Sequence, residues 1–311
     1  GFNHVCVGPV FDLGPGGDPL LVADHHRSIS NLAPAGAPAV LIRALRQACE
    51  KAGVALFVDI VLDRVALGGA SAKALAGVYE SSPGLNPLDP RVDRRVATSA
   101  MLCAGSEEAA AGWWAELLPE LVTAGAQGFR LLGLDGLPPH ALARILNRVR
   151  GKTACAFWAW TPGLPWARHV ELVGADLSVV FASTSWWDGR AAWFIDEQES
   201  LRRIAPVLGV AGVPFDAEPA SPAKVACSLM LAAATTEGLF VPHGVADSAA
   251  LQRAASLAET IACKRISGSV RALTSPASTV TVLLRTDGAD ARSARRSAVV
   301  AINTDLFNAR E

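Results

Sequence analysis

Short apolar runs alternate with amphipathic stretches along most of this chain. The run at residues 54–62 is apolar apart from Asp59, which is typical of a strand that a parallel sheet buries on both faces. Six further runs of comparable length are interpreted in the same way. The seven predicted strands cover residues 4–10, 54–62, 128–134, 154–160, 177–182, 207–215 and 238–242.

The stretches between these strands carry apolar residues at helical spacing. In residues 37–51, Val40, Leu41 and Leu45 fall on one helix face, and Gly53 follows as a residue that ends helices. Strands that alternate with helices indicate βα units and a parallel sheet. Further helices are predicted at residues 107–123, around 141–149, and at 196–204, 222–235 and 248–265.

From residue 269 the hydrophobic pattern changes to a period of two. Residues 279–285 and 297–303 read as antiparallel strands, and a polar loop separates them. The sequence therefore predicts a first domain over residues 1–268 and the beginning of a small antiparallel β domain over residues 269–311.

Seven βα units are one fewer than a closed (β/α)8 barrel contains. A doubly wound sheet is the alternative, but no Gly-x-Gly-x-x-Gly turn of a nucleotide-binding sheet follows the first strand. Polar and aromatic residues follow several different strands, as barrel active sites require. We therefore expect an α/β fold, a TIM-barrel-like domain whose first βα unit is absent from this chain and lies upstream of Gly1.

The composition excludes several classes of protein. Hydrophobic residues make up 51% of the chain and charged residues 18%, which argues against disorder. With 28 Lys and Arg against 29 Asp and Glu, the chain lacks the positive charge that nucleic acid or an anionic membrane attracts. No signal peptide and no membrane-length apolar run is visible. We expect no nucleic-acid partner and no membrane association.

The six cysteines are scattered, and no two have the CxxC spacing of a zinc or redox site. Most lie in apolar runs, which favours buried free thiols and a reducing compartment, the cytoplasm. His25 and His26 are adjacent, but no third ligand stands at a sensible spacing. The sequence therefore predicts no metal site and no cofactor.

Five short segments stand at or near predicted strands: GFNHVCVGPV (1–10), VDIVLDRVA (58–66), GFRLL (128–132), GLFVPHG (238–244) and AVVAIN (298–303). Together they resemble glycoside hydrolase family 13, the α-amylase superfamily. The order and spacing are most similar to those of the bacterial maltosyltransferases that extend α-glucan from maltose 1-phosphate. The resemblance covers nearly the whole chain and rests on the order of the five motifs.

This resemblance implies a retaining mechanism, in which a carboxylate nucleophile and a carboxylic acid lie about 5–5.5 Å apart. It places the nucleophile two residues after Arg130, where this chain has Leu132, and the acid/base residue at Trp158. The third carboxylate motif, on the seventh barrel strand, falls at Phe215 and lacks its histidine, and Arg64 replaces the histidine of the strand-three motif. Since leucine cannot attack and tryptophan cannot protonate, we expect a catalytically inactive barrel.

Four charged residues within or shortly after predicted strands are candidates for substrate binding. Asp59, inside an apolar strand, either makes a structural hydrogen bond or lines a sugar pocket. Arg130 either forms a residual ion pair, with Asp59 or Asp216, or contacts a ligand. Asp216 and Glu218 face one way if their segment is extended, and the alternative is a solvated loop.

Four tryptophans follow adjacent predicted strands. Trp158 and Trp160, and further along the chain Trp186 and Trp187, either stack on sugar rings or fill the core. Ligand pockets combine aromatic side chains with a few polar groups, so Trp158 and Trp160 join the charged residues as substrate-binding candidates.

Three functional hypotheses from different classes remain open. The first is an inactive amylase-like barrel that binds α-glucan or maltooligosaccharide, or that supports a partner in glucan metabolism. The second is an active maltosyltransferase or glycoside hydrolase with relocated carboxylates, for example Asp135 and Glu218. The third is a structural or docking module without a sugar ligand, whose partner would be the rest of a longer polypeptide or a second copy of the chain.

Overall fold

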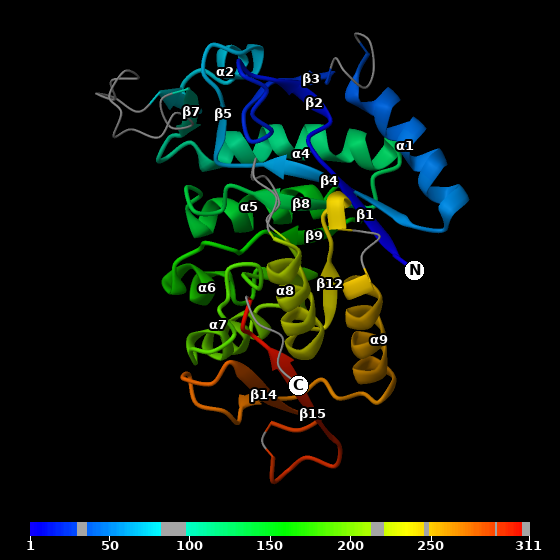
Figure 1. Ribbon diagram of the computed structural model, residues 1–311. Coiled ribbons are helices and arrows are strands. Elements are labelled where there is room, and N and C mark those ends of the chain that lie inside the picture. Colours follow the sequence, from blue (N-terminus) through cyan, green and yellow to red (C-terminus); the bar gives the residue numbers. More distant parts are fainter. Residues whose placement is uncertain (30–35, 82–97, 213–220, 246–248, 290, 307–311) are drawn as a thin grey trace. The chain divides into compact units, whose positions relative to one another are not determined.

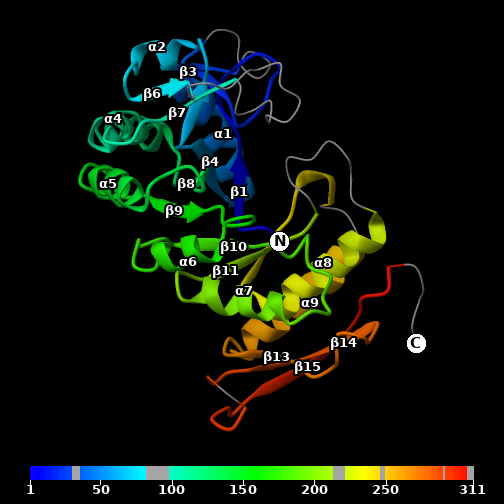
Figure 2. The same ribbon diagram turned by 90° about the vertical axis from the view of Figure 1, so that its left-hand side faces the viewer.

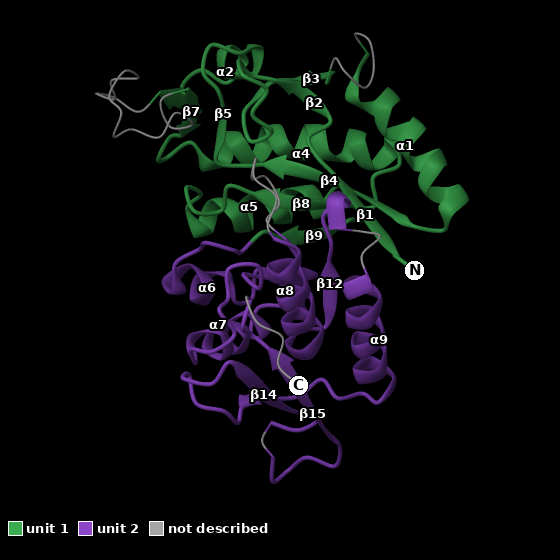
Figure 3. Ribbon diagram, in the orientation of Figure 1, with its two compact units in different colours: residues 1–160 green, residues 161–311 purple. Residues whose placement is uncertain are grey.

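The computed structural model describes the chain except for residues 30–35, 82–97, 213–220, 246–248, 290 and 307–311. The described residues group into two compact units, unit 1 over residues 1–160 and unit 2 over residues 161–311 (Figure 3). Both units are built on parallel strands that alternate with helices.

Unit 1 contains four parallel strands whose order in the sheet follows the chain: β1 (His4–Val7), β4 (Ala55–Val61), β8 (Gly128–Leu132) and β9 (Ala156–Ala159). Three helices connect them in turn: α1 (Pro38–Ala52), α4 (Glu107–Ala124) and α5 (Pro139–Arg150) (Figure 1). Helix α1 packs on β4 and α4, and α4 packs on α5. In Figure 2, α4 and α5 lie together on one side of β8 and β9. The four strands predicted in this part of the chain are confirmed, with shorter ends.

The limits of α1 follow from its sequence. Pro38 stands in the first turn of the helix, where its missing N–H and fixed φ are tolerated. Gly53 ends the helix in the left-handed region with φ of 68°, and its N–H donates to the carbonyl of Glu50 at 3.1 Å. The helix prediction for residues 37–51 is confirmed to within one residue at each end.

Two excursions of unit 1 have no counterpart in the sequence prediction. An antiparallel hairpin, β2 (Phe11–Leu13) with β3 (Val22–Ser28), precedes α1. After β4, a small antiparallel sheet in the order β5-β7-β6 and a short helix precede α4; these are β5 (Arg64–Ala66), α2 (Ala70–Ala74), β6 (Tyr79–Ser81) and β7 (Ser99–Leu102). The hydroxyl of Tyr79 donates to the carbonyl of Leu62 at 2.8 Å, which ties this sheet to the end of β4.

Unit 2 continues the alternation with three parallel strands in chain order: β10 (Val179–Ala182), β11 (Val207–Val210) and β12 (Gly238–Phe240). Its helices are α6 (Trp166–Leu172), α7 (Trp193–Arg202), α8 (Pro222–Thr235) and α9 (Ala249–Cys263), with a 3-10 turn at His243–Val245. An antiparallel sheet follows in the order β13 (Val270–Ala272), β14 (Val280–Thr286), β15 (Ser297–Asn303). This sheet begins where the sequence pattern changes period.

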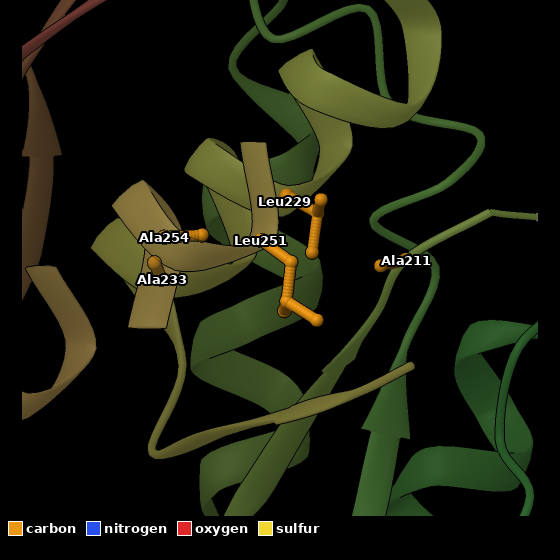
Figure 4. Close-up of a cluster of buried hydrophobic side chains, with 5 residues drawn as sticks. All are labelled: Ala211, Leu229, Ala233, Leu251 and Ala254. Atoms are coloured by element: carbon orange, nitrogen blue, oxygen red, sulfur yellow. The ribbon is translucent and has the colours of Figure 1, made fainter. Parts of the chain in front are cut away.

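A compact apolar cluster joins α8, α9 and the residue after β11. It consists of Ala211, Leu229, Ala233, Leu251 and Ala254, all buried (Figure 4). The small residues let the elements approach closely: a Cβ on Gly209 would lie 2.3 Å from the Cβ of Ala232. Residue 209 must therefore be glycine for β11 to pack on α8.

A buried arginine fastens the antiparallel sheet to α8. Arg285, on β14, donates from Nη1 to the carbonyls of Ala234 and Thr236 at 3.1 and 2.8 Å. These carbonyls stand at the end of α8, where the helix leaves them without backbone partners of its own. Nη2 of Arg285 lies 3.6 Å from Oε1 of Glu237. Burial lowers the pKa of Arg285 to about 10, and Glu237 opposes the shift.

The two units together carry seven parallel strands that alternate with helices, followed by a small antiparallel sheet. The expected fold class, a partial (β/α)8 barrel with an antiparallel appendage, is confirmed. The division at residues 268 and 269 stays a prediction, while the compact units divide at Trp160 and Thr161. None of the described helices combines the length and apolar character that crossing a bilayer requires.

All six cysteines are free. Cys49 and Cys227 are buried as the apolar runs predict, and Cys6, Cys103 and Cys155 are half-buried. Cys263 is exposed, contrary to the prediction of buried thiols, because it is the last residue of α9.

Candidate functional site

The strand register of unit 1 brings three of the candidate residues to one level of the sheet. Asp59 on β4 is paired in register with Arg130 on β8, and Arg130 with Trp158 on β9. Since successive strand residues point to opposite faces, these three side chains share one face of the sheet. Leu132 and Trp160 lie two residues further along their chains and share the same face.

Asp59 and Arg130 form a buried bidentate ion pair. Arg130 donates from Nε to Oδ1 at 2.8 Å and from Nη2 to Oδ2 at 2.6 Å, and the two residues are 3% and 4% exposed. The thiol of Cys6 donates to Oδ1 of Asp59 at 3.0 Å. A Cβ on Gly8 would lie 2.0 Å from Oδ2, so only glycine leaves room for the carboxylate. Of the two partners predicted for Arg130, Asp59 and Asp216, the structure shows Asp59.

The Asp59 carboxylate favours the charged form of Arg130. Burial opposes a charged guanidinium, but the Asp59 carboxylate outweighs it and raises the pKa of Arg130. Burial, reinforced by the negative charge of Asp59, raises the pKa of the Cys6 thiol well above its ordinary value. Cys6 is therefore a neutral hydrogen-bond donor to the carboxylate and not a nucleophile.

Two tryptophans beside the ion pair differ in their surroundings. Trp158 is 6% exposed and stacks on Phe57, with ring centroids 4.0 Å apart and planes 25° apart, while His4 meets its ring edge-on at 5.2 Å. Trp160 is half-buried, and the guanidinium carbon of Arg130 lies 5.2 Å from its ring centroid. A cation over an indole is stabilising and fixes the ring. Trp160 has more surface for a ligand than Trp158.

Leu132 is 2% exposed and ends β8. Its carbonyl accepts from the backbone N–H of Leu62 at 3.2 Å. The next residue, Gly133, has φ of 72°, so the chain turns in the left-handed region directly after Leu132. The position that the resemblance gives to a nucleophile is therefore occupied by a side chain packed into the protein.

A second charged cluster, Asp63, Arg64 and Asp135, lies past the ends of β4 and β8. Arg64 donates from Nε to both carboxylate oxygens of Asp63 at 2.9 and 3.0 Å, and its Nη2 lies 3.6 Å from Oδ1 of Asp135. Asp63 is fully buried, whereas the Asp135 side chain is 63% exposed. Burial raises the pKa of Asp63 to about 6, Arg64 opposes this and Asp135 adds to it.

Sequence reasoning missed the role of Asp63. The available signal was the pair of glycines in the segment after β8: a Cβ on Gly133 would lie 2.0 Å from Oδ1 of Asp63, and one on Gly136 would lie 2.6 Å from Oδ2. Two glycines in a short loop indicate close approach of another group, but the pattern does not say which group it is.

The other candidates lie in unit 2. Trp187 is buried and donates from Nε1 to Oε2 of Glu197 at 2.6 Å, so it fills the core, whereas Trp186 is exposed. Phe215, Asp216 and Glu218 lie outside the described residues. Among the residues that are described, no three His, Cys, Asp or Glu side chains come together as a metal ion would need.

Comparisons with known proteins agree in sequence and in fold. The chain is 28% identical to an α-1,4-glucan:maltose-1-phosphate maltosyltransferase of Burkholderia pseudomallei, over 98% of this chain and 31% of the relative. The resemblance to glycoside hydrolase family 13 is confirmed. The chain thus spans about a third of the length of that curated relative. No protein-family model matches the chain.

Solved structures of the α-amylase type share the fold. A maltogenic α-amylase, AmyB, from Thermotoga neapolitana matches with a TM-score of 0.67 and 12% identity, over 97% of this chain and 77% of that chain. A cyclic α-maltosyl-(1→6)-maltose hydrolase from Arthrobacter globiformis matches with a TM-score of 0.64 and 14% identity, over 97% of this chain and 78% of that chain. At these identities the likeness concerns the fold alone.

Proposed function

We propose that this chain is a non-catalytic member of the amylase lineage that binds α-glucan. One observation carries the proposal: the two positions that the resemblance gives to the nucleophile and the acid/base residue hold Leu132 and Trp158, both of which are buried and neither of which is a carboxylate. Retaining glycoside chemistry needs a carboxylate at each of these positions. Losing either member of such a pair removes most of the rate, because the members act as a unit.

The surroundings of Leu132 leave little room for a replacement carboxylate. Asp59 is held by Arg130 through two hydrogen bonds, and Asp63 is fully buried under the glycines that follow β8. Asp135 is exposed but shares Arg64 with Asp63. A relocated pair would have to reach within a few tenths of an ångström of the productive geometry on this scaffold. This argues against the active alternative that uses Asp135 with Glu218.

We expect no turnover of maltose 1-phosphate or of maltoheptaose. The measurement is release of inorganic phosphate and of reducing ends by the purified chain, with an active α-amylase as the positive control. Turnover at amylase-like rates that disappears in Glu218→Gln and in Asp135→Asn would contradict the proposal and support relocated carboxylates. Turnover that survives both substitutions would point to a contaminating enzyme, which repeated purification removes.

The glucan-binding part of the proposal rests on Trp160. Its ring is half-buried at the end of β9, and Arg130 fixes it from one side. An oriented aromatic face beside polar groups is typical of small-molecule sites. Asp59 and Arg130, nearly without exposed surface, would act as positioning residues beneath Trp160, and Trp158 would support the layer from within. Asp216 and Glu218 are further candidates on the segment outside the described residues.

Trp160→Ala is expected to weaken maltoheptaose binding at least tenfold, because the substitution removes the stacking surface and leaves the buried ion pair intact. Titration calorimetry measures the dissociation constant. The matched control is Trp193→Ala, whose indole is exposed on α7. An equal loss in both variants would contradict a role for Trp160. No binding at millimolar maltoheptaose would instead favour a docking module whose partner is another polypeptide or a second copy of the chain.

The location stays a prediction. Six free thiols support the cytoplasm as the compartment, since oxidising compartments favour disulfides.

A further inference from the structure

Unit 2 contains an open cavity of about 700 Å³. It lies between the helices α6 and α7, the strand β13 and the loop that follows β14. Its volume falls in the range of about 300–1,000 Å³ that small-molecule sites have. None of the functional hypotheses drawn from the sequence uses this part of the chain.

One wall of the cavity is a single face of α7. Asp196, Glu199 and Arg203 all line the cavity, and their spacing of three and four residues places them on the same side of the helix. All three are exposed, so their polar groups are available to a ligand. The opposite wall is β13, the edge strand of the antiparallel sheet, which contributes Arg271.

Trp166 supplies an aromatic surface at the start of α6. It lines the cavity and is 53% exposed, so part of its indole surface is accessible to a ligand. One turn further along α6, the buried ring of His169 packs against it with centroids 6.1 Å apart. Among the residues that the structure describes, neither ring nitrogen of His169 has a hydrogen-bond partner, so this imidazole serves as a packing surface that supports the indole.

The chemistry of these walls selects among ligand classes. Two carboxylates and two guanidinium groups balance in charge, so an anion meets Asp196 and Glu199 and a cation meets Arg203 and Arg271. A purely apolar ligand would strip water from four charged groups without replacing their hydrogen bonds. A neutral molecule rich in hydroxyl groups satisfies both kinds of side chain, because each hydroxyl donates to a carboxylate and accepts from a guanidinium. The indole adds a surface for the C–H face of a sugar ring.

We propose that this cavity is a binding site for a short, uncharged oligosaccharide, such as a segment of an α-glucan chain. All of its lining residues belong to unit 2, so binding there does not require the residues at the ends of the unit 1 strands. This site would give the chain a second point of attachment to a polymeric glucan, and two linked attachments bind a polymer more tightly than either does alone.

The test is titration of the whole chain with maltoheptaose, followed by calorimetry and by the chemical shift of each indole N–H in NMR spectra. Trp166→Ala is expected to weaken binding to this site at least tenfold and to lower the stoichiometry by one. Glu199→Ala is expected to weaken it severalfold, and Trp166→Phe to recover part of the loss. Trp193→Ala is the matched control, since Trp193 is 45% exposed in the same unit and does not line the cavity.

Two results would overturn the inference. The first is a Trp166→Ala variant that keeps both the affinity and the stoichiometry of the unaltered chain while its melting temperature is unchanged. The second is displacement of the Trp166 indole signal by inorganic phosphate and not by maltoheptaose, which would assign the cavity to an anion. If binding is lost in Trp160→Ala and retained in Trp166→Ala, the proposed function is supported and this second site is not. If binding is lost in Trp166→Ala and retained in Trp160→Ala, this site is supported and the role of Trp160 in the proposed function is not.

Discussion

Asp59→Leu is expected to lower the free energy of unfolding by about 3–5 kcal/mol, the usual cost of removing one partner of a buried ion pair. The substitution leaves Arg130 charged, 4% exposed and without its bidentate partner. A guanidinium cannot shed its proton to relieve the cost. Urea denaturation followed by circular dichroism measures the change.

A double variant separates the ion pair from simple loss of packing. In Asp59→Leu with Arg130→Met, no charge remains buried, and most of the lost stability is expected to return. Glu108→Leu is the surface control, because Glu108 pairs with Arg148 where both side chains are more than half exposed; about 1 kcal/mol or less is expected there. A double variant as unstable as Asp59→Leu would contradict the argument.

The second large effect is a loss of stability in mild acid that originates at His25. This residue is buried among the rings of Phe11, Trp113 and Trp114, and its Nδ1 lies 2.9 Å from the hydroxyl of Ser71. Burial, with a contribution from the charge of His26, lowers the pKa of His25 from 6.5 to about 3. Between those pH values His25 is protonated in the unfolded chain and neutral in the folded chain. The free energy of unfolding therefore decreases as the pH falls from about 6.5 to 3. The full effect is about 5 kcal/mol.

The pKa shift of Asp63 has the opposite effect on the pH dependence of stability, over a narrower pH range. Its pKa is raised from 3.8 to about 6, so between those values the folded chain binds the extra proton and stability rises as the pH falls. The gain is about 3 kcal/mol, which offsets part of the loss at His25.

His25→Phe removes the titrating group and so measures the contribution of His25 to the pH dependence of stability. At pH 7 the variant should be less stable by about 1 kcal/mol, since Ser71 loses a partner. Between pH 6.5 and 4 its stability should decrease much less than that of the unaltered chain. The His25 contribution is then absent and Asp63 acts in the opposite direction, while the smaller contributions of His4 and His169, whose pKa values burial also lowers, remain. Urea midpoints at half-unit steps of pH give the profile, and His26→Gln, an exposed neighbour, should follow the unaltered chain. Parallel profiles for His25→Phe and the unaltered chain would refute the assignment.

The repeated elements could be read from the sequence because their signals are local. The apolar run of β4, the periodicity of α1 and α4, and the prolines that open α5 and α8 each lie within one segment. The hairpin β2–β3 and the sheet β5-β7-β6 were missed for two reasons. Strands β2, β5, β6 and β7 have only three or four residues each, and β3, with seven residues, is largely polar and has no apolar run. Contacts with distant residues, such as that between Tyr79 and Leu62, also stabilise the β5-β7-β6 sheet.

The candidate site was predictable to a similar degree. A buried arginine needs a partner, so the sequence predicted that Arg130 either pairs with Asp59 or Asp216 or contacts a ligand. The register of β4 and β8, which places Asp59 beside Arg130, decides between them and could not be read from the sequence. Which tryptophan keeps an accessible surface did not follow, because exposure depends on the packing of several segments at once. Trp160 and Trp187 each follow a strand and each stand close to a second tryptophan in the sequence, yet Trp187 is in the core and Trp160 is half-buried.

Through Arg285, the antiparallel sheet caps the carboxyl end of helix α8. At most helix ends, water or a polar capping group donates to the last carbonyls. In α8 the Arg285 guanidinium makes these hydrogen bonds, although it lies some fifty positions away in the sequence. Transplanting the sheet onto another barrel would therefore require a matching pair of helix-end carbonyls, and trimming it away would leave α8 frayed at the end that adjoins β12.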